Sequence, residues 1–252
     1  MSHIIGLFNQ ASSQAKTTLT INLCYHLAQQ KKKVLAVDMD THAWLTKQMN
    51  VSPDEFDTTI YDVLVNQEPA SIFSNDYQFD FIPANKQLST LEATLAQAKD
   101  RQFRLKKALA PFIKEYDYIL IDCPPNLGLL SVMCMVAATH VLVPIETTEK
   151  GIQGAKDFLP TFQNVRQNLN KKLKLAGVIP TKYDGRRSHH KLKLETIHRS
   201  FSKAKIPVFP AIGLYTDFEN AWDEAKPLAA YNPNHLAVNK LKEIAQELVQ
   251  LK

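Results

Sequence analysis

Short apolar runs recur along the chain, and longer segments with helical spacing separate them. Several runs are apolar at consecutive positions instead of alternating with polar residues, which a parallel strand covered by helices on both faces requires. This pattern predicts an α/β fold with a doubly wound, mostly parallel sheet flanked by helices, whose ligands bind at the carboxyl ends of the strands. The predicted strands are residues 4–8, 34–37, 79–82, 118–121, 140–145 and 173–179.

The segments between these runs have the apolar spacing of amphipathic helices. No repeat, low-complexity tract or linker divides the chain, and its 45% hydrophobic and 22% charged residues are typical of a globular protein. We therefore expect residues 1–252 to form a single domain. The predicted helices are residues 16–29, 88–116, 127–138, 151–168 and 236–251.

The cysteines and the N-terminus indicate a reduced, cytoplasmic protein. Cys24, Cys123 and Cys134 are widely spaced and form no CxxC pair, so we expect buried thiols and neither a disulfide framework nor a metal site. No apolar run approaches the ~20 residues of a membrane span. The last predicted helix mixes acids with lysines and lacks Trp and Phe, so it is expected to pack on the core and not on a membrane.

A polar loop follows the first predicted strand and leads into the first helix. Lys16 and Thr17 open that helix, as in phosphate-binding loops, where backbone amides cradle phosphates, the lysine reaches the β- and γ-phosphates and the hydroxyl binds Mg²⁺. The usual glycines are absent, with Gln10 and Ala15 at their places, and the whole chain has only 7 glycines. Taken alone, the segment is equally well explained as a polar turn with a capping serine.

Carboxylates stand at the ends of two further predicted strands. Asp38 and Asp40 follow the second strand, and Asp122 ends the run at 118–121. A doubly wound sheet brings these ends near the polar loop. Asp122 has the setting of an acid that holds Mg²⁺ directly or through water. One such acid is usually a helix cap, but three signals at three strand ends are hard to obtain by chance.

In these segments the chain resembles the ParA/MinD family of deviant Walker ATPases. The family's phosphate loop corresponds to residues 11–18, its D-x-D-P segment is similar to residues 38–41, and its I-D-x-P-P segment is similar to residues 121–125. Residues 127–130 and 141–144 are also similar, so the resemblance covers nearly the whole chain. It implies a P-loop NTPase fold that hydrolyses ATP with Mg²⁺ as an ATP-bound sandwich homodimer.

One departure from the family pattern concerns its signature lysine, which reaches the partner's phosphates and is replaced here by Ala11. An added cation at a transferred phosphoryl group changes the rate by orders of magnitude. The chain is therefore either a binder without hydrolysis or an ATPase in which another cation acts. Our candidate is Lys150, and a solvated loop lysine is the alternative. In lacking this lysine, the chain resembles the carboxysome-positioning McdA subset of the family.

The resemblance also implies roles for individual residues. Lys16 contacts the β- and γ-phosphates, Thr17 binds Mg²⁺ and Thr18 contacts the α-phosphate. Thr181 and Pro210 contribute to the adenine pocket. The nucleotide-binding set is Ala11, Ser12, Ser13, Gln14, Ala15, Lys16, Thr17, Thr18, Thr181 and Pro210.

The catalytic and metal roles follow from the same resemblance. Asp40 positions the attacking water, Asp38 joins the Mg²⁺ shell and Asp122 completes the metal site. The alternative is that only one of Asp38 and Asp40 has a role. Ser12, Ser13 and Ala15 either adopt the left-handed backbone that glycine takes freely, at ~1–2 kcal/mol each, or the loop has another shape.

Basic residues are concentrated between residues 171 and 205, where the only acids are Asp184 and Glu195. Such a stretch is expected where a protein contacts DNA phosphates independently of sequence. The resemblance implies the same, because ParA-type proteins bind DNA non-specifically. A solvated basic face is the alternative. With so few aromatic residues we expect no base-stacking platform. The candidate DNA-binding residues are Lys182, Arg186, Arg187, Lys191, Lys193 and Arg199.

The function implied is an ATPase cycle on nucleoid DNA that positions a large cargo, carboxysomes, through an adaptor, McdB-like or ParB-like, that stimulates hydrolysis. One alternative is a plasmid or chromosome partition ATPase of the same family. Another is a pseudo-ATPase that acts as an ATP-dependent dimerisation and DNA-binding switch. A metabolic enzyme of the same fold is less favoured, because no substrate motif is recognisable.

Overall fold

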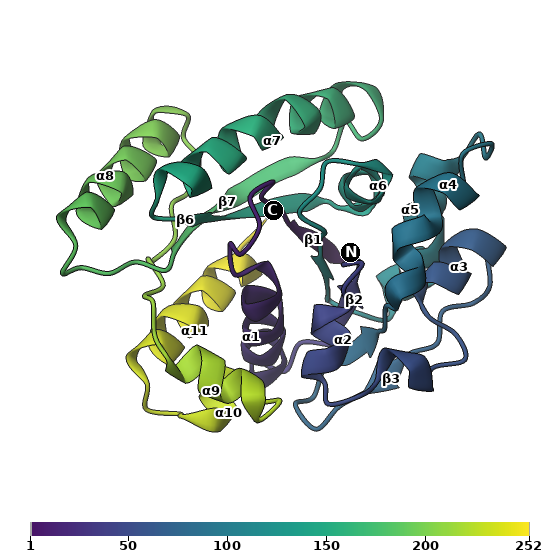
Figure 1. Cartoon of the computed structure of the whole chain (residues 1–252), viewed down its shortest axis with the longest axis horizontal. Coiled ribbons are helices and arrows are strands. Elements are labelled where there is room, and N and C mark those ends of the chain that lie inside the picture. The colour runs from purple at the N-terminus through teal and green to yellow at the C-terminus, as the bar shows by residue number, and fades with distance from the viewer. Residues whose placement is uncertain (1, 252) are drawn as a thin grey trace.

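The computed structural model describes residues 2–251 and contains, within them, a seven-stranded sheet in the order β3-β4-β2-β5-β1-β6-β7 (Figure 1). The α/β prediction is confirmed, because all neighbouring strands pair in parallel except β3 with β4. The short antiparallel strand at the edge of the sheet was not predicted. The strands are β1 (His3–Leu7), β2 (Val34–Asp38), β3 (Phe73–Ser74), β4 (Asp80–Ile82), β5 (Tyr118–Asp122), β6 (His140–Glu146) and β7 (Lys174–Thr181).

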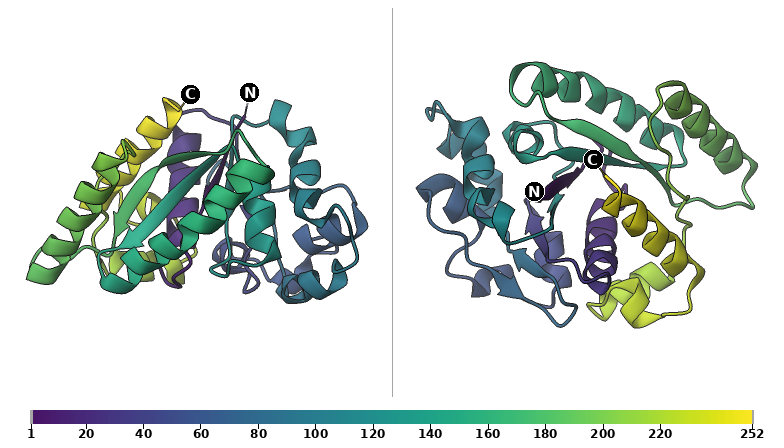
Figure 2. Two further views of the ribbon diagram at one scale, coloured as in Figure 1. Left: turned by 90° about the horizontal axis from the view of Figure 1, so that it is seen from above. Right: turned by 180° about the vertical axis from the view of Figure 1, so that it is seen from behind.

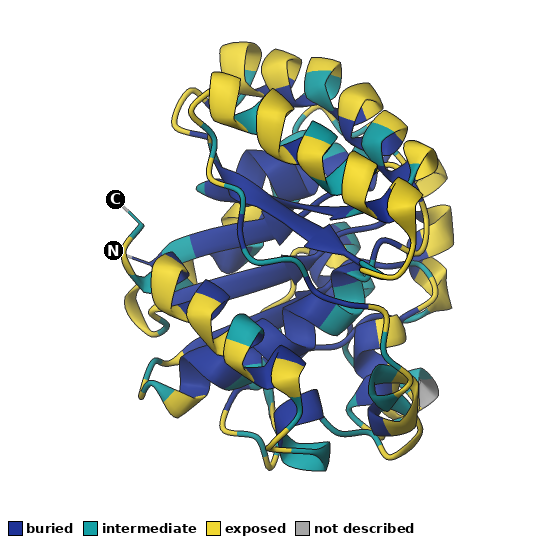
Figure 3. Ribbon diagram, turned by 90° about the vertical axis from the view of Figure 1, so that its left-hand side faces the viewer, coloured by how far each residue is buried: buried dark blue, intermediate teal, exposed yellow. Residues whose placement is uncertain are grey.

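Both faces of the sheet are covered by helices, which explains why the strands are apolar at consecutive positions (Figure 2). Ile4 points into one core and Ile5 into the other. On the Ile5 side lie α1 (Lys16–Gln29) and α11 (Leu236–Val249), and on the Ile4 side lie α6 (Leu129–Ala137) and α7 (Glu149–Asn168). The central strands are buried while the outer helix faces are exposed (Figure 3).

The helix predictions are confirmed for α1 at both ends and for α6, α7 and α11 within a few residues. Leu241, Ile244 and Leu248 of α11 are buried in the core, as the last-helix prediction required. The three cysteines are free and buried. Among the described residues, no helix is long and apolar enough to cross a membrane.

The single helix predicted over 88–116 is wrong, because that segment forms several short helical pieces. The carboxylate of Asp100 binds Arg104 and Lys107 and so favours a new helix start. Pro111 lacks an amide hydrogen and begins the last piece. The pieces are η2 (Lys86–Thr90), α4 (Leu91–Thr94), η3 (Arg101–Phe103), α5 (Arg104–Leu109) and η4 (Pro111–Lys114).

Several short helices were not predicted, and one long helix, α8 (Ser188–Lys203), lies in the basic stretch. Ile197 of α8 is buried in the same core as Phe162 of α7, so one face of α8 packs on the domain and the other is exposed (Figures 1 and 3). The remaining unpredicted helices are α2 (Trp44–Gln48), η1 (Pro53–Glu55), α3 (Ile60–Asn66), α9 (Asp217–Asp223) and α10 (Leu228–Tyr231).

The register of the central strands determines where the functional residues meet. Leu7 on β1 and Asp38 on β2 both lie opposite Asp122 on β5. The loop after β1, the segment after β2 and the end of β5 therefore share one edge of the sheet, as parallel pairing requires.

Candidate functional site

The loop between β1 and α1 has the backbone of a glycine-containing loop without any glycine. Ser13 has φ 61° and Ala15 has φ 64°, both in the left-handed region, which confirms the expectation for these two residues. Ser12, for which the same was expected, is not among the described residues with positive φ. A left-handed residue with a Cβ costs about 1–2 kcal/mol, so the surrounding structure must stabilise this loop.

Two buried amide side chains hold the loop in this shape. Asn9 Nδ2 donates to the carbonyl of Pro144 at 2.7 Å, while its Oδ1 accepts from the amide of Ala11 at 2.8 Å. The Gln14 amide group accepts from the backbone N–H of Glu146 at 2.8 Å and donates to the Ser12 carbonyl at 3.1 Å. Both side chains therefore fasten the loop to the end of β6.

Helix α7 approaches this loop closely because two of its residues are glycines. A methyl group on Gly154 would lie 2.3 Å from Asn9 Oδ1 and 2.7 Å from the Ala11 nitrogen. A methyl group on Gly151 would lie 2.3 Å from the Glu146 carbonyl. The side chains of the loop thus occupy space that the facing helix leaves open. Asn9 and these glycines were missed, although two of the chain's few glycines three residues apart were a usable signal. Gln14 was predicted to bind the nucleotide, but its role in holding the loop to β6 was not predicted.

Lys16 and Thr17 begin α1 at the carboxyl edge of the sheet. The Lys16 ammonium is buried and lies 3.4 Å from the Asn9 carbonyl. Burial lowers the pKa of Lys16, and the nearby carboxylates of Asp122 and Asp40 oppose that change. Thr17 donates from its hydroxyl to Asp122 Oδ2 at 2.6 Å.

The surroundings of Asp122 fit a divalent cation. Its Oδ1 is buried and has no hydrogen-bond partner among the described residues, and burial together with Asp38 raises its pKa. An additional positive charge would satisfy this oxygen and favour the ionised form. Mg²⁺ takes oxygen ligands and keeps several waters, so the Thr17 hydroxyl and Asp122 fit it. No cluster of three or more His, Cys, Asp or Glu residues suited to a metal occurs among the side chains that the structure describes.

Asp38 and Asp40 occupy different environments. Asp38 is fully buried, and its carboxylate accepts from the Thr46 amide and hydroxyl and from the Asp40 amide. Burial raises the pKa of Asp38 to about 6. This arrangement corrects the expectation that Asp38 joins a Mg²⁺ shell, because its oxygens are occupied and it does not line the cavity. Asp38 supports the segment that presents Asp40, which does line the cavity.

An aromatic wall that was not predicted stands beside Asp40. His42 lies with its Nδ1 3.1 Å from Asp40 Oδ1 and stacks on Trp44 with 6.2 Å between ring centroids. Trp222, from α9, meets Trp44 edge to face at 5.9 Å. These two residues are the only tryptophans of the chain, and α2 and α9 bring them together across the site.

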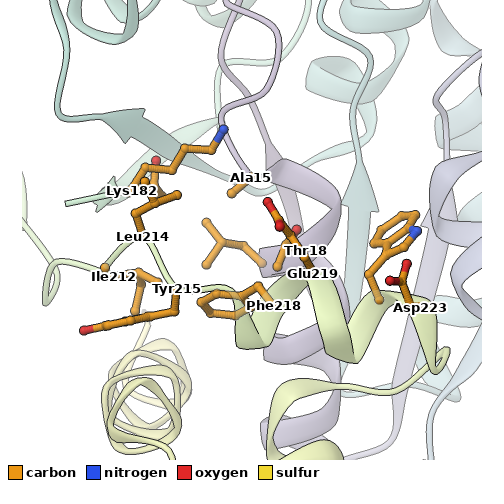
Figure 4. A pocket seen from close by; sticks show the side chains of 13 residues that line it. Ala15, Thr18, Lys182, Ile212, Leu214, Tyr215, Phe218, Glu219 and Asp223 are labelled. Atoms are coloured by element: carbon orange, nitrogen blue, oxygen red, sulfur yellow. The ribbon is translucent and has the colours of Figure 1, made fainter. Parts of the chain in front are cut away.

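Two cavities adjoin at this edge of the sheet. One, of about 370 Å³, follows the loop and contains Asp40, Lys16 and Thr17 in its wall. The other, of about 300 Å³, is mainly apolar and lies between the end of β7 and α9 (Figure 4). Thr181 lies in its wall, but Pro210 does not, because the segment before it pairs with β7 and the chain reaches the cavity only from Ile212 onward. Both cavities share Ala15, Thr18, Lys182 and Trp222.

The predicted cations are distributed differently from the sequence expectation. Lys150 is exposed in the first turn of α7 and does not line either cavity. Lys182, expected on a DNA-binding face, instead lines both cavities.

The other candidate DNA contacts lie on α8 and the turn before it. Arg186 and Arg187 are exposed and pair with Asp184 at 3.0 and 3.3 Å. Lys193 forms an ion pair with Glu149, while Lys191 and Arg199 are exposed on α8.

A family model for an AAA domain matches residues 2–175. Among curated proteins, the chromosome partitioning protein ParA from Myxococcus xanthus (strain DK1622) is 34% identical over 206 residues, which cover 81% of this chain and 73% of that protein.

Solved structures share the whole fold. Cobyrinic acid a,c-diamide synthase from Mycobacterium smegmatis with bound ADP and magnesium is 30% identical, with a TM-score of 0.84 over 99% of this chain and 95% of that one. The complex of Cyanothece McdA(D38A) with ATP is 21% identical, with a TM-score of 0.88 over 100% of this chain and 97% of that one. At that identity, the McdA likeness concerns the fold alone.

Proposed function

The chain belongs to the ParA/MinD family of Walker ATPases, and on this premise we propose that it is a single-domain, ParA-type ATPase that binds and hydrolyses ATP with Mg²⁺ in a positioning cycle. The observation that carries the proposal is the pair formed by Thr17 and Asp122 at 2.6 Å, near the buried Lys16, because the other carboxylate oxygen of Asp122 has no hydrogen-bond partner among the described residues. The cavity of about 370 Å³ along the loop (the phosphate cavity), the Lys16 ammonium and the oxygen site proposed for Mg²⁺ thus lie together.

The loop residues have distinct roles in this proposal. Backbone amides from Ser12 to Thr18 and the N-terminus of α1 bind the phosphates, while Lys16 neutralises the β- and γ-phosphates. Thr17 and Asp122 hold Mg²⁺, which supplies positive charge against the phosphate oxygens. Asp40 accepts a hydrogen bond from the attacking water and orients it. The apolar cavity with Thr181 in its wall receives the adenine.

Calorimetry with ATP and ADP, with and without Mg²⁺, tests binding, and phosphate release tests hydrolysis. We expect wild-type protein to bind both nucleotides more tightly with Mg²⁺. Asp40→Ala should retain binding while hydrolysis falls by about 10²-fold or more, the usual effect of losing a general base or water-positioning group. Wild-type protein without nucleotide affinity would refute the proposal.

We further propose that ATP drives formation of a sandwich dimer in which Lys150 supplies a cation to the partner's phosphates. Lys150 is exposed at the start of α7 and lies outside the cavities of its own chain, which suits action on a second copy. Lys150→Ala should reduce ATP hydrolysis without changing ADP affinity, and Lys156→Ala on the same helix is the control. Hydrolysis at the wild-type rate in Lys150→Ala would refute this role.

The exposed cations of α8 and the preceding turn form the proposed DNA-binding surface. Such a surface supports the proposal that the protein is cytoplasmic and associates with the nucleoid. Binding should be independent of sequence and decline with salt, because released counterions supply the affinity. Replacing both Lys191 and Arg199 with Ala should make the slope of log affinity against log salt concentration less steep by about two, because two phosphate contacts are lost. Unchanged affinity and slope would exclude this surface.

The most specific part of the proposal concerns the cargo and the adaptor. The McdA-like fold and Ala11 in place of the signature lysine favour carboxysomes and an McdB-like adaptor. The identity to ParA favours a chromosome or plasmid with a ParB-like adaptor as the alternative. Pull-down of the ATP-bound Asp40→Ala protein from its host, followed by a test of whether the recovered partner stimulates ATP hydrolysis, distinguishes them.

Two other functions are tested by the same assays. A pseudo-ATPase would bind ATP and dimerise without turnover in the presence of DNA and partner. The likeness to cobyrinic acid a,c-diamide synthase keeps a metabolic ligase as a second candidate. ATP hydrolysis that depends on cobyrinic acid and glutamine, and not on DNA, would favour the ligase.

A further inference from the structure

Lys182 follows β7 in a strained conformation between two well-anchored neighbours. Its φ is 51°, in the left-handed region that is strained for a residue with a Cβ. The Thr181 carbonyl accepts from the Thr147 amide at 3.1 Å, and the Tyr183 amide donates to the Ile212 carbonyl at 3.0 Å. Such strain persists only where the surroundings fix it, and it concentrates at ligand sites.

The Lys182 side chain lies where the two cavities join. It lines the apolar cavity together with Leu214 and lines the phosphate cavity together with Ala15. In Figure 4 it extends away from Leu214 toward the loop that precedes α1, with its amine at the loop end. A nucleotide whose base occupies the apolar cavity must pass this junction before its phosphates reach Lys16.

The charges around the junction favour an anionic ligand. The neighbouring cations Arg186, Arg187 and Lys193 are all paired with acids, whereas no carboxylate among the described side chains lies within the 4.0 Å of an ion pair with Lys182. The phosphate cavity contains only one other lysine, Lys16, among its lining residues. Glu219 and Asp223 of α9 also line the apolar cavity, and in Figure 4 the Glu219 carboxylate points toward Ala15, but neither residue forms an ion pair with Lys182.

We propose that Lys182 supplies a second ammonium group, from the same chain, to the diphosphate of a bound nucleoside di- or triphosphate. The inference rests on the proposed nucleotide binding. It differs from the role of Lys150, because a contact within one chain acts on ADP and needs no dimer. Removing this charged hydrogen bond should weaken nucleotide affinity about tenfold, because partial exposure of Lys182 reduces its strength.

Calorimetry of ADP binding to the full chain, with Mg²⁺ and at low and high salt, tests the proposal. Lys182→Met keeps the length of the side chain without its charge. Lys182→Asn also removes the charge and tolerates the left-handed backbone, so it provides a folded variant if Lys182→Met does not fold. Both should bind ADP about tenfold more weakly, Lys182→Arg should recover most of the affinity, and the difference should shrink with salt.

The matched control is Lys205→Met, because Lys205 is also a lysine with positive φ, 55°, but is exposed and outside both cavities. It should bind ADP like the wild type. Wild-type affinity for ADP in folded Lys182→Met or Lys182→Asn would overturn the inference while leaving the proposed function intact, and so would a loss confined to DNA binding. If the wild type binds no nucleotide, both fall together.

Discussion

Replacing Gly154 with alanine should destabilise this protein, although the same change usually stabilises a helix. In a helix interior alanine is favoured over glycine by about 1 kcal/mol. At this position, however, the new methyl group would lie 2.3 Å from Asn9 Oδ1 and 2.7 Å from the Ala11 nitrogen. Neither group can withdraw easily, because Asn9 is buried and holds the loop to Pro144 at 2.7 Å.

The expected size of the effect follows from what must move. Displacing Asn9 breaks its 2.8 Å hydrogen bond to the Ala11 amide, and an unsatisfied buried group costs about 1–3 kcal/mol. Overpacking costs about 1–3 kcal/mol more, and the helix preference offsets about 1 kcal/mol. We expect a net loss of about 1–5 kcal/mol, or roughly 2–10 °C in Tm for a chain of this size.

Thermal and urea unfolding followed by circular dichroism measure the change. Gly185→Ala is the control, because a methyl group there would meet only the Tyr183 ring at 3.5 Å or more, an ordinary contact. Since the loop binds the phosphates, Gly154→Ala should also weaken ADP binding. A Gly154→Ala protein as stable as the wild type, or more stable, would show that α7 does not constrain the loop.

Three further predictions follow. Asp38 has a pKa raised from 3.8 to about 6 in the folded protein, so the folded state binds more protons and, without nucleotide, the Asp38 contribution to stability should fall by up to about 3 kcal/mol as pH rises from 4 to 6; Asp38→Asn should reduce the pH slope in urea titrations, and the raised pKa of Asp122 should keep part of it. Tryptophan fluorescence should change on ADP addition, because Trp222 lines both cavities and Trp44 lines the cavity along the loop; Trp222→Phe should remove more of the change than Trp44→Phe, and unchanged fluorescence of the wild type at saturating ADP would contradict the site. Thr17→Ala should eliminate the gain in ADP affinity that Mg²⁺ provides, measured by calorimetry with and without EDTA, and a persisting gain would remove Thr17 from the metal site.

The fold and the order of the site segments were predictable because they are encoded locally. Consecutive apolar positions indicated strands buried on both faces, and β1, β2, β5, β6 and β7 were found where the pattern predicted them. Lys16, Thr17 and Asp122 could be anticipated because parallel strands bring their carboxyl ends to one edge. The helix over 88–116 could not be excluded, since its apolar spacing persists through the breaks near Asp100 and Pro111.

What only the tertiary structure decided is which side chains meet at that edge. Asp38 and Asp40 are two residues apart, yet one supports the segment from within the core and the other lines the cavity. Lys182 belongs by sequence to the basic stretch and by position to the cavity. Local periodicity determines that a chain forms strands and helices. It does not determine which distant surfaces pack against each other. The loop without glycine is therefore explained only by the tertiary structure, in which Gly154 of α7 leaves room for Asn9 and Ala11.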